Sequence, residues 1–249
     1  ETSHWASSKP MQVDILAFGA HPDDVEIGCG GTIAKHVAQG HSIGLVDLTR
    51  GEMGSRGTVI DRDREGIKAA QILGASFRVN LDLPDGRLVN DFDSQQRIIE
   101  LLRLHKPRIV LCNAPRDRHP DHGVASAMVV EACFRAGLNK WESVGEDGKA
   151  QQPYRPEHVY HYIQFYDLQA DFTVDISDFI DVKMDSLAAH ASQFYQSDSD
   201  APDTVISSKW FWESLRARSA EWGRVMGVSH AEGFIATRRI GLDSLFALR

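Results

Sequence analysis

The sequence contains few cysteines, and they form no recognisable pattern. Cys29, Cys112 and Cys133 are scattered along the chain, with no Cys-x-x-Cys pair among them. This spacing argues against a disulfide framework. We expect three free, mostly buried thiols in a protein of the reducing cytoplasm.

Long apolar runs and an excess of basic charge are also missing. No apolar run approaches the roughly 20 residues that span a bilayer. The 27 basic residues are outnumbered by 35 acidic residues, which gives a net charge of −8. Nucleic acids and anionic membranes attract a basic face, so neither is expected as a partner.

The beginning of the chain differs from the rest. Residues 1–10 are polar, have no apolar segment typical of a signal peptide, and precede Met11, where a natural start would fit. We expect these residues to be an added segment outside the fold. Residues 11–249 are expected to form one domain, which is long enough for a sizeable buried core.

Short apolar runs alternate with amphipathic segments. The predicted strands are Val13–Phe18, Ser42–Leu48, Phe77–Leu81, Arg108–Cys112, His158–Tyr166 and Phe172–Ile176. The predicted helices are Gly28–Ala38, Asp61–Leu73, Ser94–His105, Pro120–Ala136, Asp178–Tyr195 and Ser207–Met226. This alternation predicts an α/β fold with a mostly parallel sheet and helices on both faces. The polar segment between the fourth helix and the fifth strand is expected to be a surface loop.

The first chemical signal is His21-Pro22-Asp23-Asp24, directly after the first predicted strand. Ligands bind at the carboxyl ends of strands in open α/β sheets. Two adjacent aspartates there are costly unless a cation or hydrogen bonds compensate them. His21 and Asp24 carry donor atoms that zinc accepts, and Asp23 remains free beside them. Taken alone, the motif also fits a helix start, where aspartate is a common cap.

The second signal is His119-Pro120-Asp121-His122, shortly after the fourth predicted strand. Pro120 suits the first turn of a helix, and the two histidines share one helical face because they are three residues apart. Two histidines and an aspartate at a strand end indicate a metal site or an acid–base pair. This motif, too, fits a capped helix start when it is considered alone.

The two motifs are more informative together because both fall at strand carboxyl ends. A catalytic zinc site needs three protein ligands and one open position, and the motifs supply His21, Asp24 and His122. Asp23 is then placed to act as the general base. A protonated His119, held in its tautomer by Asp121, would stabilise the oxyanion or protonate the leaving amine.

These residues resemble the LmbE-like (PIG-L) zinc deacetylase superfamily, which is marked by a leading HPDD-type motif and a later HPDH. The resemblance extends over residues 12–243. Several segments are most similar to the branch that deacetylates N-acetylglucosaminyl-malate in bacillithiol biosynthesis. These segments are Phe18–Gly28, Gly30–Thr32, Leu48–Gly54, Leu83–Gly86, Ser192–Phe194 and Ala231–Phe234.

The resemblance implies a Rossmann-like sheet, Zn²⁺ as the cofactor, an amino-sugar substrate and a homo-oligomer, with hexamers common among relatives. It implies the same ligands, His21, Asp24 and His122, and the same catalytic residues, Asp23, His119 and Asp121. It also matches Arg62 to an arginine that reaches the substrate pocket. Arg50 and Glu52, on the loop after the second predicted strand, are weaker candidates for sugar or malate contacts.

Several alternatives stay open. Arg62 lies in a charged run, so a solvated helix face is a second interpretation. Gly28, Gly30 and Gly31 do not complete a G-x-G-x-x-G motif, which argues against a dinucleotide. The leading function is deacetylation. The alternatives are an amidase acting on thiol conjugates of the same scaffold and a non-catalytic zinc- or carbohydrate-binding module. A two-histidine, one-aspartate site also accepts Fe²⁺ and other divalent metals.

Overall fold

The computed structural model describes residues 11–145, 147–197 and 200–247, so the segment 1–10 lies outside the described residues. The strands are β1 (Ile15–Gly19), β2 (Ile43–Thr49), β3 (Phe77–Leu83), β4 (Ile109–Cys112), β5 (His158–Tyr162), β6 (Phe172–Asp175) and β7 (Ala231–Ala236). The α-helices are α1 (Asp24–Ala38), α2 (Val59–Leu73), α3 (Phe92–His105), α4 (Pro120–Ala136), α5 (Ile180–Ala188) and α6 (Lys209–Met226). Two short 3₁₀ helices are η1 (Ser177–Phe179) and η2 (Leu245–Ala247).

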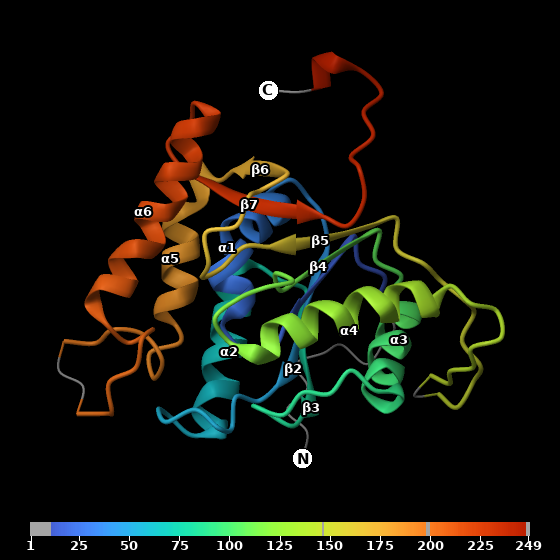
Figure 1. Cartoon of the computed structure of the whole chain (residues 1–249). Helices are drawn as coiled ribbons and strands as arrows, with labels where there is room; N and C mark the ends of the chain where they lie inside the picture. The colour runs from blue at the N-terminus through green and yellow to red at the C-terminus, as the bar shows by residue number, and fades with distance from the viewer. Residues whose placement is uncertain (1–10, 146, 198–199, 248–249) are drawn as a thin grey trace.

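The strands form one seven-stranded sheet in the order β3-β2-β1-β4-β5-β7-β6 (Figure 1). The pairs from β3 to β5 are parallel, whereas β7 runs antiparallel to both β5 and β6. The prediction of a single α/β domain with a mostly parallel sheet is therefore confirmed. The antiparallel strands are confined to one edge of the sheet.

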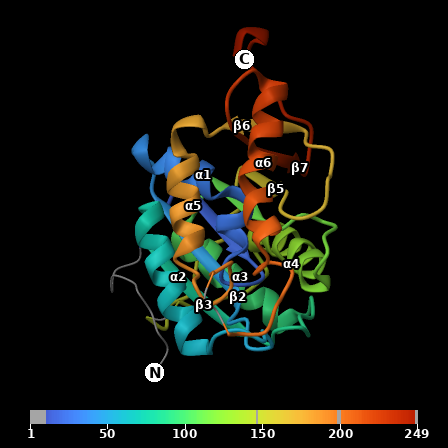
Figure 2. The same cartoon turned by 90° about the vertical axis from the view of Figure 1, so that its left-hand side faces the viewer.

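Both faces of the sheet are covered by helices. In β1, Leu16 and Phe18 join the core beneath α3 and α4, whereas Ile15 and Ala17 join the core beneath α1 and α2. Successive side chains of a strand point to opposite faces, so a strand covered on both sides is apolar throughout. Figures 1 and 2 show α3 and α4 on one side of the sheet and α1, α2, α5 and α6 on the other.

The chain order creates a crevice between β1 and β4. From β1 the chain proceeds through β2 to β3 at one edge of the sheet, and then resumes on the other side of β1 with β4. The loops that leave the carboxyl ends of β1 and β4 therefore diverge to opposite faces. Such a switch point is where open α/β sheets bind ligands. Both histidine motifs begin in these two loops and continue into the first turns of α1 and α4.

Helix α1 begins four residues earlier than predicted, at Asp24, and is broken at Cys29, whose φ is −147°. The carboxylate of Glu232, from β7, accepts hydrogen bonds from Gly31 N at 3.1 Å and Thr32 N at 2.7 Å. It therefore caps the second half of the helix, where backbone N–H groups have no helical partner. Lys183 of α5 balances the buried charge at 2.5 Å from Glu232.

Strand β7 was not predicted, because Glu232 and Gly233 interrupt its apolar pattern. Tertiary contacts explain both residues. Glu232 caps α1, and Gly233 is required because a Cβ at this position would lie 0.9 Å from the ring of Trp222. The helix predicted to extend to Tyr195 instead ends at Ala188. Beyond it, the backbone N–H of Ser192 donates to Glu65 of α2 at 2.7 Å, which holds this segment in a turn.

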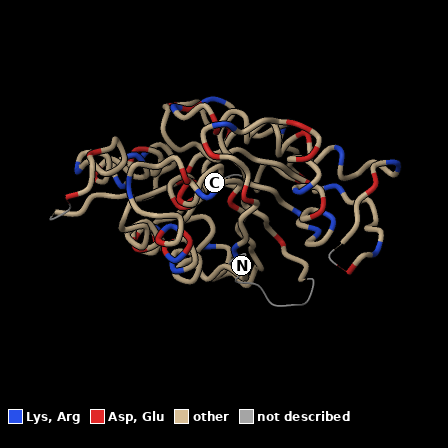
Figure 3. The backbone as a smooth tube through the Cα atoms, turned by 90° about the horizontal axis from the view of Figure 1, so that it is seen from below, with Lys and Arg blue, Asp and Glu red and all other residues tan. Residues whose placement is uncertain are grey.

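The surface charge is mixed. Acidic and basic residues are interspersed along the backbone in the view of Figure 3. Among the described residues, no helix combines the length and apolar character required to cross a bilayer.

Candidate active site

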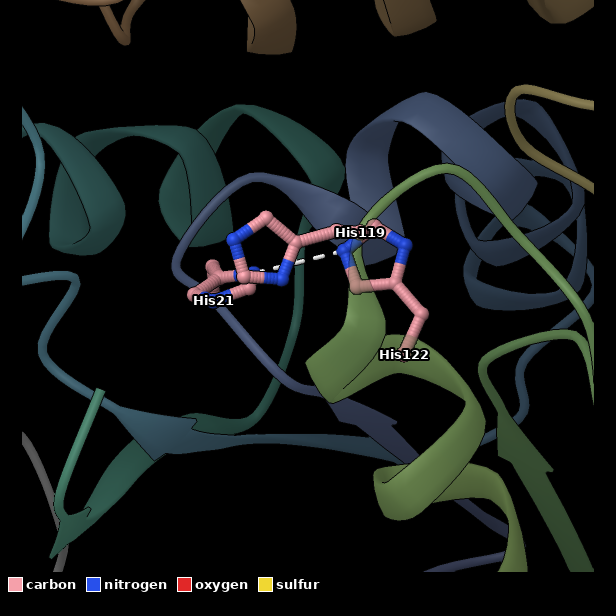
Figure 4. Close-up of side chains that lie close together, drawn as sticks. All are labelled: His21, His119 and His122. Atoms are coloured by element: carbon pink, nitrogen blue, oxygen red, sulfur yellow. Dashed lines mark hydrogen bonds between the residues drawn. The ribbon is translucent and has the colours of Figure 1, made fainter. Parts of the chain in front are cut away.

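Three donor atoms converge at the crevice between β1 and β4. Nδ1 of His21 lies 3.5 Å from Oδ2 of Asp24, and Nε2 of His122 lies 3.2 Å from Oδ1 of Asp24. The two histidine nitrogens are 3.3 Å apart. His21 comes from the loop after β1, Asp24 is the first residue of α1, and His122 lies in the first turn of α4. In Figure 4 a dashed line joins ring nitrogens of His21 and His122, and the ring of His119 overlaps that of His21 in this view.

Two buried carboxylates orient these rings. Nε2 of His21 lies 3.0 Å from Oδ1 of Asp85, and Nδ1 of His122 lies 2.9 Å from Oδ2 of Asp117. Because an ionised carboxylate only accepts hydrogen bonds, each ring must donate through that nitrogen. In the neutral rings, the lone pairs of His21 Nδ1 and His122 Nε2 then face Asp24.

This donor set fits a metal ion. Two lone pairs and a carboxylate at 3.2–3.5 Å from one another repel unless a proton or a metal ion lies between them. Zinc bonds of about 2.0–2.1 Å in tetrahedral geometry place the ligand atoms about 3.3–3.4 Å apart. Among the described residues, two further groups of side chains lie close enough together to hold a metal ion. They are His21 with His119 and His122, and His21 with Asp85 and Asp121.

The Asp24 carboxylate is held from three sides. Its Oδ2 accepts hydrogen bonds from the backbone N–H of His21 at 2.9 Å and from Asn113 Nδ2 at 3.0 Å. Its Oδ1 accepts from Gln164 Nε2 at 2.8 Å. Asn113 directly follows β4, so its place at a strand end is a signal that the sequence prediction overlooked. Gln164 follows β5 and has no comparable motif around it.

Asp23 is buried beside these donor atoms, but its carboxylate does not accept hydrogen bonds as that of Asp24 does. It is 4% exposed, and its nearest cation is Arg62, whose Nη2 lies 3.8 Å from Asp23 Oδ1. Among the described residues, no hydrogen bond to its carboxylate is found. An uncommitted carboxylate next to a metal site is free to accept a proton.

His119 precedes α4, and its ring lies 4.5 Å from that of His21. The backbone N–H of Asp121 donates to His119 Nδ1 at 3.3 Å, which leaves Nε2 as the N–H donor of the neutral ring. The Asp121 carboxylate instead accepts from Gly86 N at 2.7 Å and lies 3.6 Å from His21 Nε2. Tautomer control thus comes from the Asp121 backbone, whereas the sequence suggested its carboxylate.

The environment disfavours a protonated His119. Burial, followed by the positive charges that His21 and His122 carry when they are protonated, lowers the pKa of His119 below its ordinary 6.5. A neutral ring still presents Nε2–H as a donor, whereas the sequence suggested a protonated ring.

The arginine of the charged run is buried. Arg62 is 5% exposed, so the interpretation as a solvated helix face is wrong. Its Nη1 donates to Gly51 O at 2.9 Å, and its Nε has no hydrogen-bond partner among the described residues. Gly51 has a φ of +67°, and a Cβ there would lie 1.7 Å from Arg62 Nη1, which explains the glycine.

The other two predicted substrate contacts already have protein partners. Arg50 forms an ion pair with Asp63 of α2. Glu52 Oε1 accepts from the backbone N–H of Asp85 at 2.7 Å. Both side chains therefore order the loops around the crevice.

Asp85 and Asp117 were missed as site residues. Asp85 belongs to the segment Leu83–Gly86, which was used for the family resemblance but was given no role in the site. Asp117 stands between two arginines in a loop, where a charged residue ordinarily faces solvent. Proximity to His119 in the sequence was the only available signal for Asp117.

Comparisons with known proteins show the family of this chain. The family model described as PIG-L, GlcNAc-PI de-N-acetylase, matches residues 16–133. Diacetylchitobiose deacetylase from Thermococcus kodakarensis is 31% identical over 88% of this chain and 81% of its own length. The chain belongs to the PIG-L family. With its candidate His/Asp metal site, it is a hydrolase of the family's de-N-acetylase type.

Other relatives show the breadth of this fold. The solved structure of the conserved protein TT1542 from Thermus thermophilus has a TM-score of 0.82 and 37% identity, over 93% of this chain and 97% of that one. A protein named 4-oxalmesaconate hydratase, from Pseudomonas putida, is 28% identical over 76% of this chain and 79% of its own length. The PIG-L relatives therefore include a protein named for a different reaction.

Proposed function

We propose that this PIG-L protein is a zinc-dependent deacetylase that hydrolyses the acetamide of an N-acetylglucosamine conjugate. The observation that carries the proposal is the buried carboxylate of Asp23, which accepts no hydrogen bond among the described residues and lies beside three converging donor groups. A site that only binds metal or sugar has no need of such a carboxylate, which argues against a non-catalytic module.

His21 Nδ1, the Asp24 carboxylate and His122 Nε2 would hold the zinc ion. When bound, zinc supplies a Lewis acid that activates water and polarises the acetyl carbonyl. Asp23 accepts the proton of the attacking water as its oxygen bonds to the carbonyl carbon. His119 donates Nε2–H to the carbonyl oxygen as negative charge develops there. The carbon–nitrogen bond then breaks, and the proton held by Asp23 passes to the departing amine, which leaves acetate and a free amino sugar.

Arg62 has two tasks in this scheme. Its positive charge, 3.8 Å from Asp23 Oδ1, faces the buried carboxylate that acts as the general base. Its Nε, which has no partner among the described residues, is available to a substrate oxygen. Arg50 and Glu52 would act on the substrate through the loops that they order.

The substrate class is supported by the relatives. The relative from Thermococcus kodakarensis is named for a substrate that carries acetylated amino sugars. The finer proposal, N-acetylglucosaminyl-malate in bacillithiol biosynthesis, rests on the resemblance of segments such as Leu83–Gly86. None of the relatives described above bears that name.

Acetate release tests the proposal. The zinc-loaded protein should release acetate from at least one of N-acetylglucosamine, N,N′-diacetylchitobiose and N-acetylglucosaminyl-malate, with one new primary amine per acetate. Amine formation from a thiol conjugate without acetate release would favour the amidase. Hydration of an unsaturated dicarboxylic acid, with no acetate from any amino sugar, would overturn the deacetylase assignment.

We also propose that the protein is a homo-oligomer joined through its C-terminal arm, residues 238–247. All residues of this arm are exposed, including Leu245 at 81% and Phe246 at 98%. Figure 1 shows the arm leaving β7 and extending away from the body of the molecule. Exposed apolar clusters of this kind mark interaction sites.

Replacing both Leu245 and Phe246 with Asp is expected to lower the molar mass of the assembly, measured by light scattering after size-exclusion chromatography. Charged residues cannot replace apolar ones in a packed interface without a large desolvation cost. Val225→Asp, at a position 75% exposed on α6, is the matched control and should leave the mass unchanged. An unchanged mass in the double variant would show that the arm does not join the copies.

A further inference from the structure

Asp117 is a buried acid that has no task in the chemical steps above. It lies in the loop between β4 and α4, and its side chain is 1% exposed. Both carboxylate oxygens are engaged. Oδ2 lies 2.9 Å from His122 Nδ1, and Oδ1 accepts from the backbone N–H groups of Arg118 at 2.8 Å and Tyr166 at 3.2 Å.

The segment that Asp117 contacts also supports a second ligand. Gln164, two residues before Tyr166, donates to Asp24 Oδ1 at 2.8 Å. Residues 164–166 therefore connect with Asp24 through Gln164 and with His122 through Asp117. These three residues follow β5, which lies next to β4 in the sheet.

The same segment reaches the surface near the site. Tyr166 is 40% exposed, and its ring lies 6.0 Å from that of Phe165. The guanidinium groups of Arg116 and Arg118, which flank Asp117 in the sequence, lie over these rings at 5.7 Å and 5.1 Å. An exposed aromatic ring held by a guanidinium offers a flat face to the part of a substrate beyond its acetamide.

We propose that Asp117 is a positioning residue that ties the segment 164–166 to the proposed ligand His122. It fixes the His122 tautomer on one side and the backbone of Tyr166 on the other. Metal affinity and binding of the distal part of the substrate are therefore coupled through one carboxylate. The proposal rests on the proposed zinc-dependent function, but its first measurement does not require deacetylase activity.

The number of acceptors makes the proposal specific. Three N–H donors, from His122, Arg118 and Tyr166, point at Asp117, and a carboxylate provides two acceptor oxygens. An asparagine provides only one acceptor oxygen, and its NH₂ group would face a donor. Asp117→Asn therefore cannot accept hydrogen bonds from both His122 and the backbone of Tyr166, whereas Asp117→Ala accepts neither.

Zinc affinity is measured first, by competition with a chromogenic chelator, on the wild type, Asp117→Ala and Asp117→Asn. Loss of a carboxylate that orients a metal-bound histidine weakens metal binding about 10–100-fold, and we expect this in Asp117→Ala. Asp117→Asn should fall between Asp117→Ala and the wild type. Asp171→Asn is the matched control, because Asp171 Oδ2 accepts from Ala236 N at 2.8 Å at the far edge of the sheet. Its zinc affinity should equal that of the wild type.

Kinetics at saturating zinc separate positioning from simple structural support. With zinc restored, Asp117→Asn should show a raised KM and a kcat close to that of the wild type. The reason is that the segment 164–166, which is proposed to bind the distal part of the substrate, is no longer held by the hydrogen bond from Tyr166 N to Asp117. Wild-type zinc affinity in both Asp117 variants would overturn the inference, even if deacetylation is confirmed. Conversely, weakened zinc binding in a protein that releases no acetate would retain the role of Asp117 and reject the proposed function. Asp117→Asn conserves side-chain volume, so the comparison survives if Asp117→Ala fails to fold.

Discussion

Asp23→Asn is expected to retain bound zinc while kcat falls by about 10²–10⁴, the usual contribution of general acid–base catalysis. The amide preserves the shape of the side chain but removes the oxygen that accepts the proton of water. The contact of Asp23 with Arg62, at 3.8 Å, is too long to be a strong structural tie. KM should change little, since the lost interaction belongs mainly to the transition state. Metal analysis and steady-state kinetics on the purified variant check both parts.

Asp24→Asn is the matched comparison, because the substitution is the same and the position is adjacent. Asp24 carries ligand-type oxygens at 3.2 Å from His122 Nε2 and 3.5 Å from His21 Nδ1. This variant should lose zinc, and added zinc should partly restore its activity. If Asp23→Asn loses zinc and Asp24→Asn keeps it, the roles of the two aspartates are reversed.

Arg78→Met is expected to lower the free energy of unfolding by about 3–5 kcal/mol, the usual cost of removing one partner from a buried ion pair. The Arg78 guanidinium donates to Asp47 at 2.7 Å and 2.8 Å and to Glu26 at 2.5 Å. All three side chains are at most 5% exposed. The variant would leave two buried carboxylates without the guanidinium that they share. Urea denaturation of the apo-protein in excess chelator measures the effect without a contribution from metal binding.

The destabilisation should also depend on pH. Burial raises the pKa of Glu26, but the charges of Arg78 and His190 outweigh it and lower the pKa from its ordinary 4.5 to about 2. A depressed carboxyl pKa stabilises the fold fully above the unfolded value, and this contribution is lost as the pH falls through the folded value. The difference between wild type and Arg78→Met should therefore shrink as the pH falls from about 4.5 toward 2.

Arg108→Met provides the control for this prediction. Arg108 pairs with Glu157 at 3.1 Å, but both side chains are more than half exposed. Solvent screens such a pair, so the stability of this variant should stay close to that of the wild type. Equal stability of the Arg78 and Arg108 variants would show that the buried cluster does not stabilise the fold.

The sequence by itself determined the alternation of strands and helices and the two histidine motifs at strand ends. These features are local: a strand covered on both faces is apolar, as in β1, and the residues after it are polar where the sheet opens. That local pattern was sufficient to predict that the two histidine motifs, including Asp23 and Asp24, meet at one edge of the sheet. It was not sufficient to predict β7. Glu232 interrupts the apolar pattern of this strand because its carboxylate caps α1, two hundred residues earlier in the chain.

Only the tertiary structure decided how the site is oriented. Asp85 reaches His21 across 64 residues of sequence, and Gln164 reaches Asp24 across 140. Periodicity reports which face of an element is buried, but it does not report which polar group meets another across the sheet. Such contacts between distant elements determine the tautomers of His21 and His122. They also determine that the Asp23 carboxylate accepts no hydrogen bond and that Arg62 is buried. Buried polar groups must find partners, and packing, rather than sequence distance, decides which partner is within reach.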